Sequence, residues 1–377
     1  MQAISAIALS SVLALLGIWF GYPCAIWVLA RVAPKPLQAQ RGPAWVPTVS
    51  VILATRDTAP DIARRTANLL ETDYPAALLE VLVVLDAASA NDTLEHAAAT
   101  DARIRVLRGD APGGKAATLN AGVRGATGEI LVMADSAQQF DRCTIPELVA
   151  ALHDRRFGAV SGALSLGSAG GRRSPVHWYW AMEKWLRSNE ARLHSSIGVT
   201  GAVYAVRRAL WPIIPDGTLL DDVFVPMTLV MRGHRVGFTY AAHASDLRTF
   251  DAKAEGERKS RTLTGVLQLT KLIPNVLTTQ NPVLIQFVMH KLARLCTPIV
   301  LVVGVLATTA LAITALVQDP RVLLPPLLAA IAAIAVVPAL RRSAWQVLRW
   351  TMSLQSATLR AINNGVRGRW SVWQNSR

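Results

Sequence analysis

Residues 81–86 read V-L-V-V-L-D, a short run of mostly branched apolar side chains that ends in a carboxylate. This length and composition are typical of a strand that is buried on both faces of a parallel sheet. Short apolar runs also occur in residues 49–54, 104–107 and 128–135, and the last of these likewise ends in a carboxylate, Asp135. A helical pattern over residues 61–71 follows the first of these segments. Strands that alternate with helices predict an α/β domain whose ligand binds at the carboxyl ends of a mainly parallel sheet.

This prediction makes two carboxylates candidate ligand-binding residues. Asp86 and Asp135 are each the first carboxylate beyond the end of a predicted strand. An aspartate at such a point often caps the helix that follows, which is the alternative for either residue alone. Two of them in one ordered series favour ligand binding at the edge of the sheet.

Three hydrophobic segments flank or follow this domain. Residues 3–30, 296–317 and 322–340 contain no Asp, Glu, Lys or Arg, and each is near the roughly 20 residues needed to cross hydrocarbon. The first segment lacks a basic leader and is too long for the core of a cleaved signal peptide. Basic residues lie beside the spans, namely Arg31, Lys35, Arg41, Lys291, Arg294, Arg341 and Arg342. The positive-inside rule therefore predicts a cytoplasmic central domain and C-terminus.

The formal net charge of +14 restricts the partners. Nucleic acid is not expected, because the Lys and Arg residues flank hydrophobic segments instead of alternating with exposed aromatic residues. Anionic membrane lipids and phosphorylated substrates suit this charge better. The three cysteines lie far apart in the sequence, so neither a disulfide framework nor a CxxC metal site is expected.

The expected organisation has six parts. Residues 274–295 mix apolar and basic side chains, which predicts an amphipathic helix at the membrane interface. In residues 343–377, Arg349 and Arg360 make a further transmembrane helix costly, so this segment is either an interfacial helix or a fourth span. The parts are a transmembrane helix in residues 1–32, a linker in 33–48, the α/β domain in 49–250, interface helices in 251–295, two transmembrane helices in 296–342 and the C-terminal segment 343–377.

Five motifs follow one another in this chain. They are G-G-K-A-A-T-L-N-A-G at residues 113–122, Asp135, T-G-A at 200–202, L-D-D at 220–222 and R-K-S-R at 258–261. In this order they resemble the family 2 glycosyltransferases, in particular the membrane synthases of cellulose, hyaluronan and chitooligosaccharides. The resemblance implies a Rossmann-like GT-A domain on the cytoplasmic side, with transmembrane helices at both ends and amphipathic interface helices.

The resemblance also assigns a donor site. It places the nucleoside beside Thr55, Asp57 and Asp86, whose oxygens can accept hydrogen bonds from a uracil N–H or ribose hydroxyls. Lys115 matches the lysine of the family's GK-x-x-x-LN motif, where it supplies charge near phosphate and the glycines allow close backbone approach. An ordinary turn with a solvated lysine is the alternative for residues 113–115.

A divalent metal, Mg²⁺ or Mn²⁺, is implied at Asp135. This residue matches the first Asp of the family's D-x-D motif, but Ala137 stands where the second would be. Metal binding would then rest on Asp135 with help from Gln138, Asp141, His243 or the substrate. Mg²⁺ is often held by only one or two carboxylates and by substrate phosphates.

Catalytic and acceptor residues follow from the same resemblance. The last Asp of the family's T-E-D motif is the catalytic base and corresponds to Asp222, with Asp221 in support; a dry site raises a carboxylate's pKa towards the working pH. The alternative is that both residues only favour a helix N-terminus. Thr200, Gly201 and Ala202 match an element near the acceptor. The aromatic face of Trp180 suits a sugar, or else packs in a core.

The family's Q-x-x-R-W motif corresponds to residues 258–262. Arg261 keeps the position of the phosphate-binding Arg, Arg258 replaces the Gln, and Thr262 replaces the Trp. Because that Trp stacks on the acceptor in processive members, transfer is better supported here than processive elongation.

Together these features predict an inverting glycosyltransferase in a plasma membrane, in bacteria the inner membrane. It would move a sugar from a nucleotide sugar, expected to be UDP-linked, to a saccharide acceptor in exopolysaccharide or cell-surface polysaccharide synthesis, alongside export partners. One alternative is transfer of a single sugar to a polyprenyl-phosphate-linked lipid. The other is a catalytically silent subunit of a polysaccharide assembly complex, motivated by Ala137.

Overall fold

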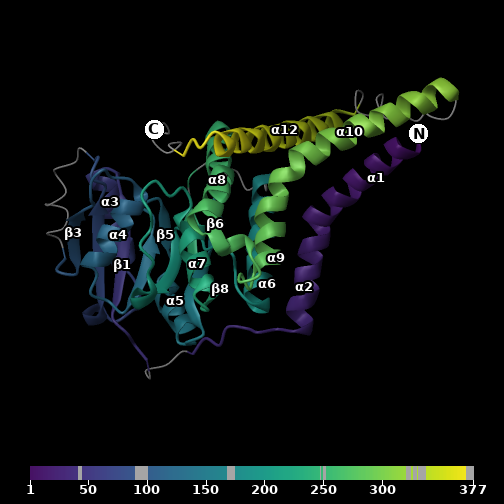
Figure 1. The fold of residues 1–377 in the computed structure, drawn as a ribbon. Helices are drawn as coiled ribbons and strands as arrows, with labels where there is room; N and C mark the ends of the chain where they lie inside the picture. The colour runs from purple at the N-terminus through teal and green to yellow at the C-terminus, as the bar shows by residue number, and fades with distance from the viewer. Residues whose placement is uncertain are drawn as a thin grey trace. The chain divides into compact units, whose positions relative to one another are not determined.

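The computed structural model divides into two compact units (Figure 1). One unit comprises Met1–Ala25, Asp251–Leu267 and Phe287–Arg377, and the other comprises Ile26–Phe250 and Gln268–Gln286. The structure describes residues 1–40, 45–89, 101–167, 175–246, 248, 252–319, 324–325, 329 and 337–370.

An eight-stranded sheet forms the centre of the second unit, in the order β3-β2-β1-β4-β7-β6-β8-β5. Its strands are β1 Val49–Thr55, β2 Leu79–Leu85, β3 Ile104–Arg108, β4 Ile130–Ala134, β5 Gln138–Phe140, β6 Phe157–Leu166, β7 Val203–Arg207 and β8 Arg235–Asp246. The first four strands pair in parallel, as the apolar runs predict. The other half of the sheet is mixed, because β7 pairs antiparallel with both β4 and β6 and β5 pairs antiparallel with β8.

Helices cover both faces of this sheet. On one face α3 (Ala59–Leu70) and α5 (Thr144–Leu152) pack over alternate strand residues such as Val51, Val83 and Val132. On the other face lies α4 (Lys115–Gly125), where a Cβ on Gly122 would stand 2.8 Å from the side chain of Val84. Glycine therefore lets α4 approach the sheet closely. The unit also contains α6 (Pro175–Leu193), α7 (Asp221–Met231) and the short 3₁₀ turns Ala76–Leu78 and Arg208–Leu210.

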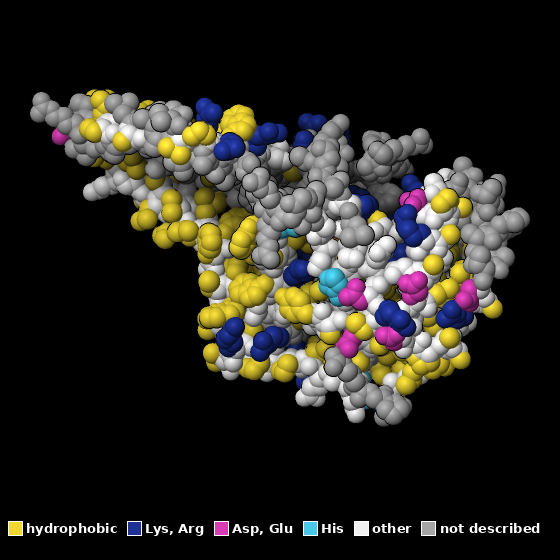
Figure 2. Space-filling view, turned by 180° about the vertical axis from the view of Figure 1, so that it is seen from behind, with side chains coloured by type: hydrophobic (Ala, Val, Ile, Leu, Met, Phe, Trp, Pro, Cys, Tyr) yellow, Lys and Arg dark blue, Asp and Glu magenta, His cyan; other side chains and the backbone are white. Residues whose placement is uncertain are grey.

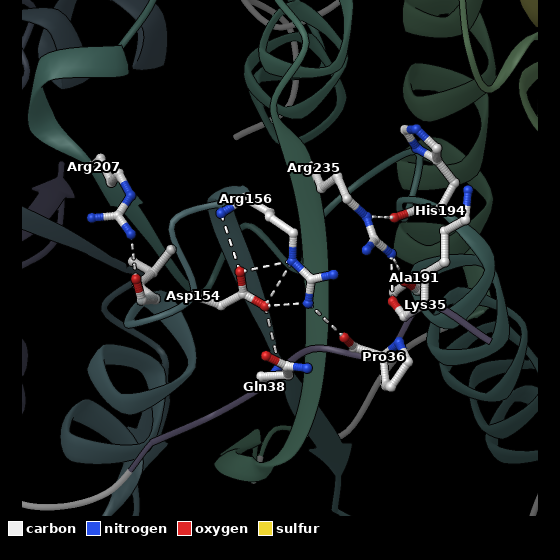
Figure 3. Close-up of polar contacts among 10 residues, drawn as sticks. Lys35, Pro36, Gln38, Asp154, Arg156, Ala191, His194, Arg207 and Arg235 are labelled. Atoms are coloured by element: carbon white, nitrogen blue, oxygen red, sulfur yellow. Dashed lines mark hydrogen bonds and ion pairs between the residues drawn. The ribbon is translucent and has the colours of Figure 1, made fainter.

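Part of the predicted linker is held against the sheet domain by arginine side chains (Figure 3). Arg235 donates from Nη2 to the carbonyl oxygen of Lys35 at 2.7 Å. Arg156 donates to the carbonyl oxygen of Pro36 at 3.2 Å and also binds Asp154, with a contact of 2.6 Å. These contacts hold the chain at Lys35 and Pro36.

The first unit is helical. Its helices α1 (Gln2–Leu16) and α10 (Ala293–Gln318) lie side by side (Figure 1). A Cβ on Gly304 would stand 2.9 Å from the Cβ of Ser11, so small residues permit this close packing. Two stretches, Gln2–Val32 and Leu284–Gln318, are long and apolar enough to cross a membrane, on length and composition alone. Figure 2 shows hydrophobic side chains gathered along these helices. Leu13, Phe20 and Leu306 are among the exposed large hydrophobic residues of these segments.

The remaining helical elements are the π-helical turn Gly17–Gly21, α2 (Tyr22–Val32), α8 (Ala252–Leu272), the 3₁₀ turn Pro274–Leu277, α9 (Leu284–Phe287), the π-helical turn Val288–Leu292 and α12 (Pro338–Val366). Most of the third predicted span, residues 322–340, lies outside the described residues, as do residues 371–377. The described residues therefore leave the number of spans and the nature of the C-terminal segment as predictions.

The prediction of one amphipathic helix over residues 274–295 is wrong. Residues Pro274–Leu277 form an isolated 3₁₀ turn, and the next helix begins only at Leu284 and continues into α10. Pro282 lacks a backbone N–H, and the side chain of Asn281 accepts a hydrogen bond from Val283 N at 3.0 Å, just before the next helix begins at Leu284.

Candidate active site

The carboxyl ends of β1, β2 and β4 bring three predicted site residues to one edge of the sheet. Thr55 pairs with Leu85, directly before Asp86. Leu53 of β1 pairs with Ala134, directly before Asp135. The parallel register thus places polar side chains from distant parts of the sequence at the same level of the sheet.

Asp86 is almost fully buried and is held by backbone and side-chain donors. Arg56 Nη2 donates to it at 2.9 Å, Gly114 N at 2.7 Å and Ala88 N at 2.9 Å. Burial alone would raise the pKa of Asp86, but these hydrogen bonds outweigh burial and lower the pKa below its ordinary value. Asp86 therefore stays ionised and links the end of β2 to the glycine pair before α4.

The glycine pair is shaped for this contact. Gly113 and Gly114 both have positive φ, 92° and 99°. A Cβ on Gly113 would stand 2.6 Å from Oδ1 of Asp86, whereas a Cβ on Gly114 would meet nothing within 4 Å. Glycine is required at position 113 both by the backbone conformation and by the close approach of a carboxylate.

Asp57 joins the ends of β1 and β4. Its carboxylate accepts hydrogen bonds from the hydroxyls of Thr55, at 3.2 Å, and of Ser136. The hydroxyl of Thr55 also accepts a hydrogen bond from Asp57 N at 2.9 Å. Thr55, Asp57 and Asp86 thus lie at neighbouring strand ends, where the sequence predicts the nucleoside.

Lys115, the first residue of α4, lies between two carboxylates. Its Nζ is 3.4 Å from Oδ1 of Asp135 and 3.5 Å from Oδ2 of Asp221. Burial lowers the pKa of Lys115, but the negative charges of Asp135, Asp221 and Asp222 raise it by more, so the pKa lies above its ordinary value. The ammonium therefore stays charged and offsets the repulsion among these carboxylates.

Gly201 of the T-G-A motif completes this cluster. A Cβ on Gly201 would stand 3.4 Å from the Cβ of Asp222 and 3.8 Å from Nζ of Lys115. The backbone of the same segment is tied to α7, because Val199 N donates to the carbonyl oxygen of Asp222 at 2.9 Å. The structure thus brings together Lys115, Asp135, Gly201 and the aspartate pair, which the sequence predicts in separate motifs.

The neighbours of Gly201 are placed differently. Thr200 N donates to Ser161 Oγ at 2.9 Å, and Arg187 of α6 reaches the hydroxyl of Thr200 at 3.5 Å. Ala202 is buried next to β7. Trp180 lies on α6 and is half-buried, two turns before Arg187 and therefore on a similar side of the helix.

The aspartate pair stands at the start of α7, as the L-D-D motif predicts. Asp221 is buried and Asp222 is partly exposed. The loop before them is held by Gln268, near the end of α8. Its Oε1 accepts a hydrogen bond from Leu219 N at 2.9 Å and its Nε2 donates to the carbonyl oxygen of Gly217 at 2.9 Å. Gln268 was missed at the sequence level because nothing in its own segment marks a contact with this loop.

Tyr204 was also missed. It lies in β7, fully buried, and its hydroxyl has no hydrogen-bond partner among the described residues. Burial raises the pKa of Tyr204 well above its ordinary value, and the charges of Asp221, Asp222 and Asp135 raise it further. An aromatic residue inside an apolar strand reads as ordinary core, so no sequence signal could have identified it.

The described residues do not form a metal site of their own. The carboxylate of Asp135 lies 3.4 Å from the ammonium of Lys115, and Ala137 offers no ligand atom. The two expected helpers Asp141 and His243 bind each other at 3.0 Å. Nowhere in the described part of the chain are three His, Cys, Asp or Glu side chains grouped so as to hold a metal ion. The donor set therefore does not fit a metal held by protein carboxylates.

Arg258 and Arg261 lie on α8, in the part of that helix that belongs to the first unit. The side chain of Arg258 lies outside the described side chains. Their role at the diphosphate stays a prediction.

Comparison with known proteins agrees with this fold. Residues 50–211 match the sequence profile of Glycosyl transferase family 2. No curated protein sequence matches the chain. The structure is similar to the mannosyltransferase PcManGT from Pyrobaculum calidifontis, solved in complex with GDP-Man and Mn²⁺. The TM-score is 0.70 at 23% identity, over 99% of this chain and 100% of that one.

A second solved structure, GalNAc-T7 with UDP, GalNAc and Mn²⁺, has a TM-score of 0.46 at 15% identity, over 60% of this chain and 48% of that one. The likeness to PcManGT establishes the fold, and the matched profile covers the strands that carry Asp86, Lys115 and Asp135. These findings support a glycosyltransferase: residues 50–211 match Glycosyl transferase family 2, and the fold is of the GT-A type.

Proposed function

We propose that this chain is an inverting membrane glycosyltransferase that transfers a sugar from a nucleotide sugar to a hydroxyl group of a saccharide acceptor. The observation that carries the proposal is the position of Lys115 between Asp135 and Asp221, with Asp222 beside it across Gly201. One cation and three carboxylates at the carboxyl edge of a GT-A sheet suit charge stabilisation and proton removal in one site.

Lys115 acts on the leaving group. Its ammonium, held at the start of α4, stabilises the negative charge of the departing nucleoside diphosphate. Asp57 and Asp86 accept hydrogen bonds from the nucleoside, and their own donors keep both carboxylates in fixed orientations. The site therefore orients the donor before the acceptor reacts.

Asp222 acts on the acceptor. It takes the proton from the acceptor hydroxyl as that oxygen forms a bond to the anomeric carbon of the donor sugar. The bond from the anomeric carbon to the diphosphate oxygen breaks, and the electron pair leaves with the diphosphate. Attack from the side opposite the leaving group inverts the anomeric configuration.

Asp221 supports this reaction through Lys115. Its carboxylate lies 3.5 Å from the ammonium, and the buried start of α7 holds it there. Thr200 and Ala202 flank Gly201 and, with Trp180, shape the acceptor side of the site in this proposal. Arg258 and Arg261 contribute to diphosphate binding.

The donor is proposed to carry UDP, as in the synthases that the motifs resemble, with GDP as the competing nucleotide because PcManGT was solved with GDP-Man. The two long apolar helices support action at a membrane. The catalytic domain is proposed to lie in the cytoplasm, and the acceptor is proposed to be an exopolysaccharide or a cell-surface polysaccharide. PcManGT was solved with Mn²⁺, so the assay below includes Mg²⁺ and Mn²⁺.

A donor panel tests the proposal. The detergent-purified full chain is incubated with UDP-, GDP- and dTDP-sugars and candidate acceptors, and nucleotide release is measured. Asp222→Asn should abolish release, whereas Asp216→Asn, which changes an exposed aspartate in the loop before α7, should not. NMR of the product should show the inverted anomeric configuration.

The alternatives give different results in the same assay. A single sugar on a polyprenyl-phosphate acceptor, without elongation, would favour the lipid-linked reaction that the replacement of the stacking Trp by Thr262 suggests. Absence of both binding and release with every donor would sink the proposal and favour a silent subunit.

A further inference from the structure

A basic pocket of about 340 Å³ lies beside Asp135. It is formed by α3, by the segment after β4 and by the chain just beyond β8. Its lining residues are Arg64, Arg65, Asn68, Ser136, Ala137, Gln138, Gln139 and Arg248. Three of these side chains carry a positive charge and none carries a carboxylate, so the pocket suits an anionic group.

Arg65 is the most constrained of these cations. Its Nε donates to the carbonyl oxygen of Asp135 at 2.9 Å, its Nη1 donates to Asn68, and its guanidinium lies 4.3 Å from the centre of the Phe140 ring. Only 2% of the residue is exposed, and burial lowers its pKa to about 9. Its Nη2 has no hydrogen-bond partner among the described residues, which leaves one donor of a buried cation unused.

Arg248 stands across the pocket in an ion pair. It donates to Asp246 at 3.0 Å and 2.7 Å, and 58% of its side chain is exposed. The negative charges of Asp135 and Asp57 also act on it, after the hydrogen bond to Asp246. Asp246 is itself engaged by Gln138 Nε2 at 2.7 Å. Arg248 therefore lies close to the carboxylates of the donor site while most of its side chain faces solvent.

Ala137 decides how this pocket differs from a metal site. It occupies the second carboxylate position of D-x-D and lines the pocket. A carboxylate there would attract a divalent cation and would lie among three arginines. With a methyl group instead, the positive charge that a diphosphate requires is available from the guanidinium groups of Arg65 and Arg248, which can donate to phosphate oxygens.

We propose that this pocket binds the diphosphate of the nucleotide donor through Arg65 and Arg248, in the place where a D-x-D site uses a metal ion. This assignment rests on the proposed function and names the residues that stabilise the negative charge of the donor diphosphate. Donor binding then needs no divalent metal, and the pocket contributes to ground-state binding while Lys115 acts on the leaving group.

Nucleotide binding in the presence of EDTA tests this assignment. The detergent-purified full chain is titrated with UDP, GDP, uridine and guanosine by calorimetry, in EDTA and in Mn²⁺. The diphosphate of the preferred base should bind in EDTA at least about tenfold more tightly than its nucleoside, and Mn²⁺ should change its affinity by less than about threefold.

Substitutions at Arg248 and Ala137 test whether diphosphate binding depends on this pocket. Arg248→Gln should weaken diphosphate binding in EDTA about tenfold and leave nucleoside binding unchanged. Arg142→Gln is the matched control, because Arg142 is likewise an exposed arginine in an ion pair with an aspartate, Asp73. Ala137→Asp should weaken binding in EDTA and make it depend on Mn²⁺. Arg65→Gln is secondary, because loss of a buried arginine can impair folding.

The outcomes separate the two proposals. Diphosphate binding that requires Mn²⁺ in the wild-type chain and ignores Arg248→Gln would overturn the pocket assignment and leave the proposed transferase intact. Binding of glucuronate in a parallel titration, with no binding of UDP or GDP in EDTA, would make the pocket a carboxylate site for an acidic sugar and would also overturn the assignment. Absence of binding of every nucleotide, with and without metal, would sink both.

Discussion

The ammonium of Lys115 lies 3.5 Å from the carboxylate of Asp221, although one residue begins α4 and the other begins α7. Each helix starts at the same edge of the sheet, so a cation and an anion from distant segments meet there. The contact joins the residue proposed to stabilise the leaving group to the pair that contains the proposed base.

Replacing Lys115 by Met should reduce kcat by roughly 100-fold to 1,000-fold, because three carboxylates then lose their shared cation and the leaving group loses its stabilising charge. Nucleotide release at saturating donor measures this loss. Arg124→Met, on the exposed side of the same helix, is the control and should keep full activity. Unchanged release by the Lys115 variant would exclude a role at the leaving group.

Gly113→Ala should weaken donor binding at least about tenfold, because its Cβ would stand 2.6 Å from Asp86 and displace that carboxylate. Gly114→Ala shares the positive φ but meets no atom within 4 Å, so it serves as the matched control for backbone strain. The Kd for the nucleotide is the measurement. Equal losses in both variants would mean that strain alone matters and that Asp86 is not displaced.

Tyr204→Phe should be at least as stable as the wild type but slower, with kcat about tenfold lower at unchanged KM. A buried hydroxyl without a hydrogen-bond partner costs about 1–3 kcal/mol, so its removal does not destabilise the fold. The negative charges of Asp221, Asp222 and Asp135 act on its hydroxyl, and we expect this hydroxyl to donate a hydrogen bond in the site during the reaction. Thermal unfolding and kcat are measured together; full activity with raised Tm would show a purely structural residue.

Gln268→Met should lower kcat about tenfold and leave donor Kd unchanged, since the loop of Gly217 and Leu219 loses both hydrogen bonds just before the proposed base. The control is Gln286→Met, which removes a buried glutamine bonded to the carbonyl oxygen of Ser195. Equal effects of the two variants on kcat would indicate general loosening of the fold. A change in Kd without a change in kcat would contradict the prediction.

Glu80 gives stability a defined pH dependence. Burial raises its pKa, but hydrogen bonds from Ser50, Thr127 and Arg105 lower it to about 2. Because the folded state lowers the pKa of Glu80 from its ordinary value of 4.5, ionised Glu80 stabilises the protein at pH values above 4.5. This contribution is lost as the pH falls from 4.5 towards 2.

Glu80→Gln should therefore lower Tm at pH 7, by an amount corresponding to about 1–3 kcal/mol. The difference in Tm between wild type and variant should stay constant down to about pH 5 and shrink below pH 4.5, the ordinary pKa of the glutamate. Glu71→Gln, at an exposed position, should show no such difference. A gap that persists at pH 3 would mean that packing, and not the charge, is responsible.

Much of the parallel half of the sheet could be predicted from local patterns. The apolar runs before Asp86 and Asp135 form β2 and β4, and L-D-D marks the start of α7. These predictions succeed because burial on both faces and helix initiation depend on neighbouring residues. The antiparallel pairing of β7 with β4 and β6 was not predictable, because pairing depends on where distant segments dock.

The same limit explains the errors and omissions at the site. The mixed apolar and basic pattern of residues 274–295 suggested one helix, but Pro282 and Asn281 interrupt it. Arg65 reads as one more charged residue of an amphipathic helix, and only its burial under the segment after β4 reveals it. Periodicity reports which face of a helix is apolar and not what covers the polar face.

The sequence by itself determined the parallel strands, the carboxylates at their ends, the order of the motifs and the long apolar segments, because each depends on the composition of a short stretch. Only the tertiary structure decided that Lys115 lies between Asp135 and Asp221, that Gly201 adjoins Asp222, and that three arginines line one pocket together with Ala137. These are contacts between segments far apart in the chain, and they form when the packing of helices on a shared sheet fixes the distances between side chains.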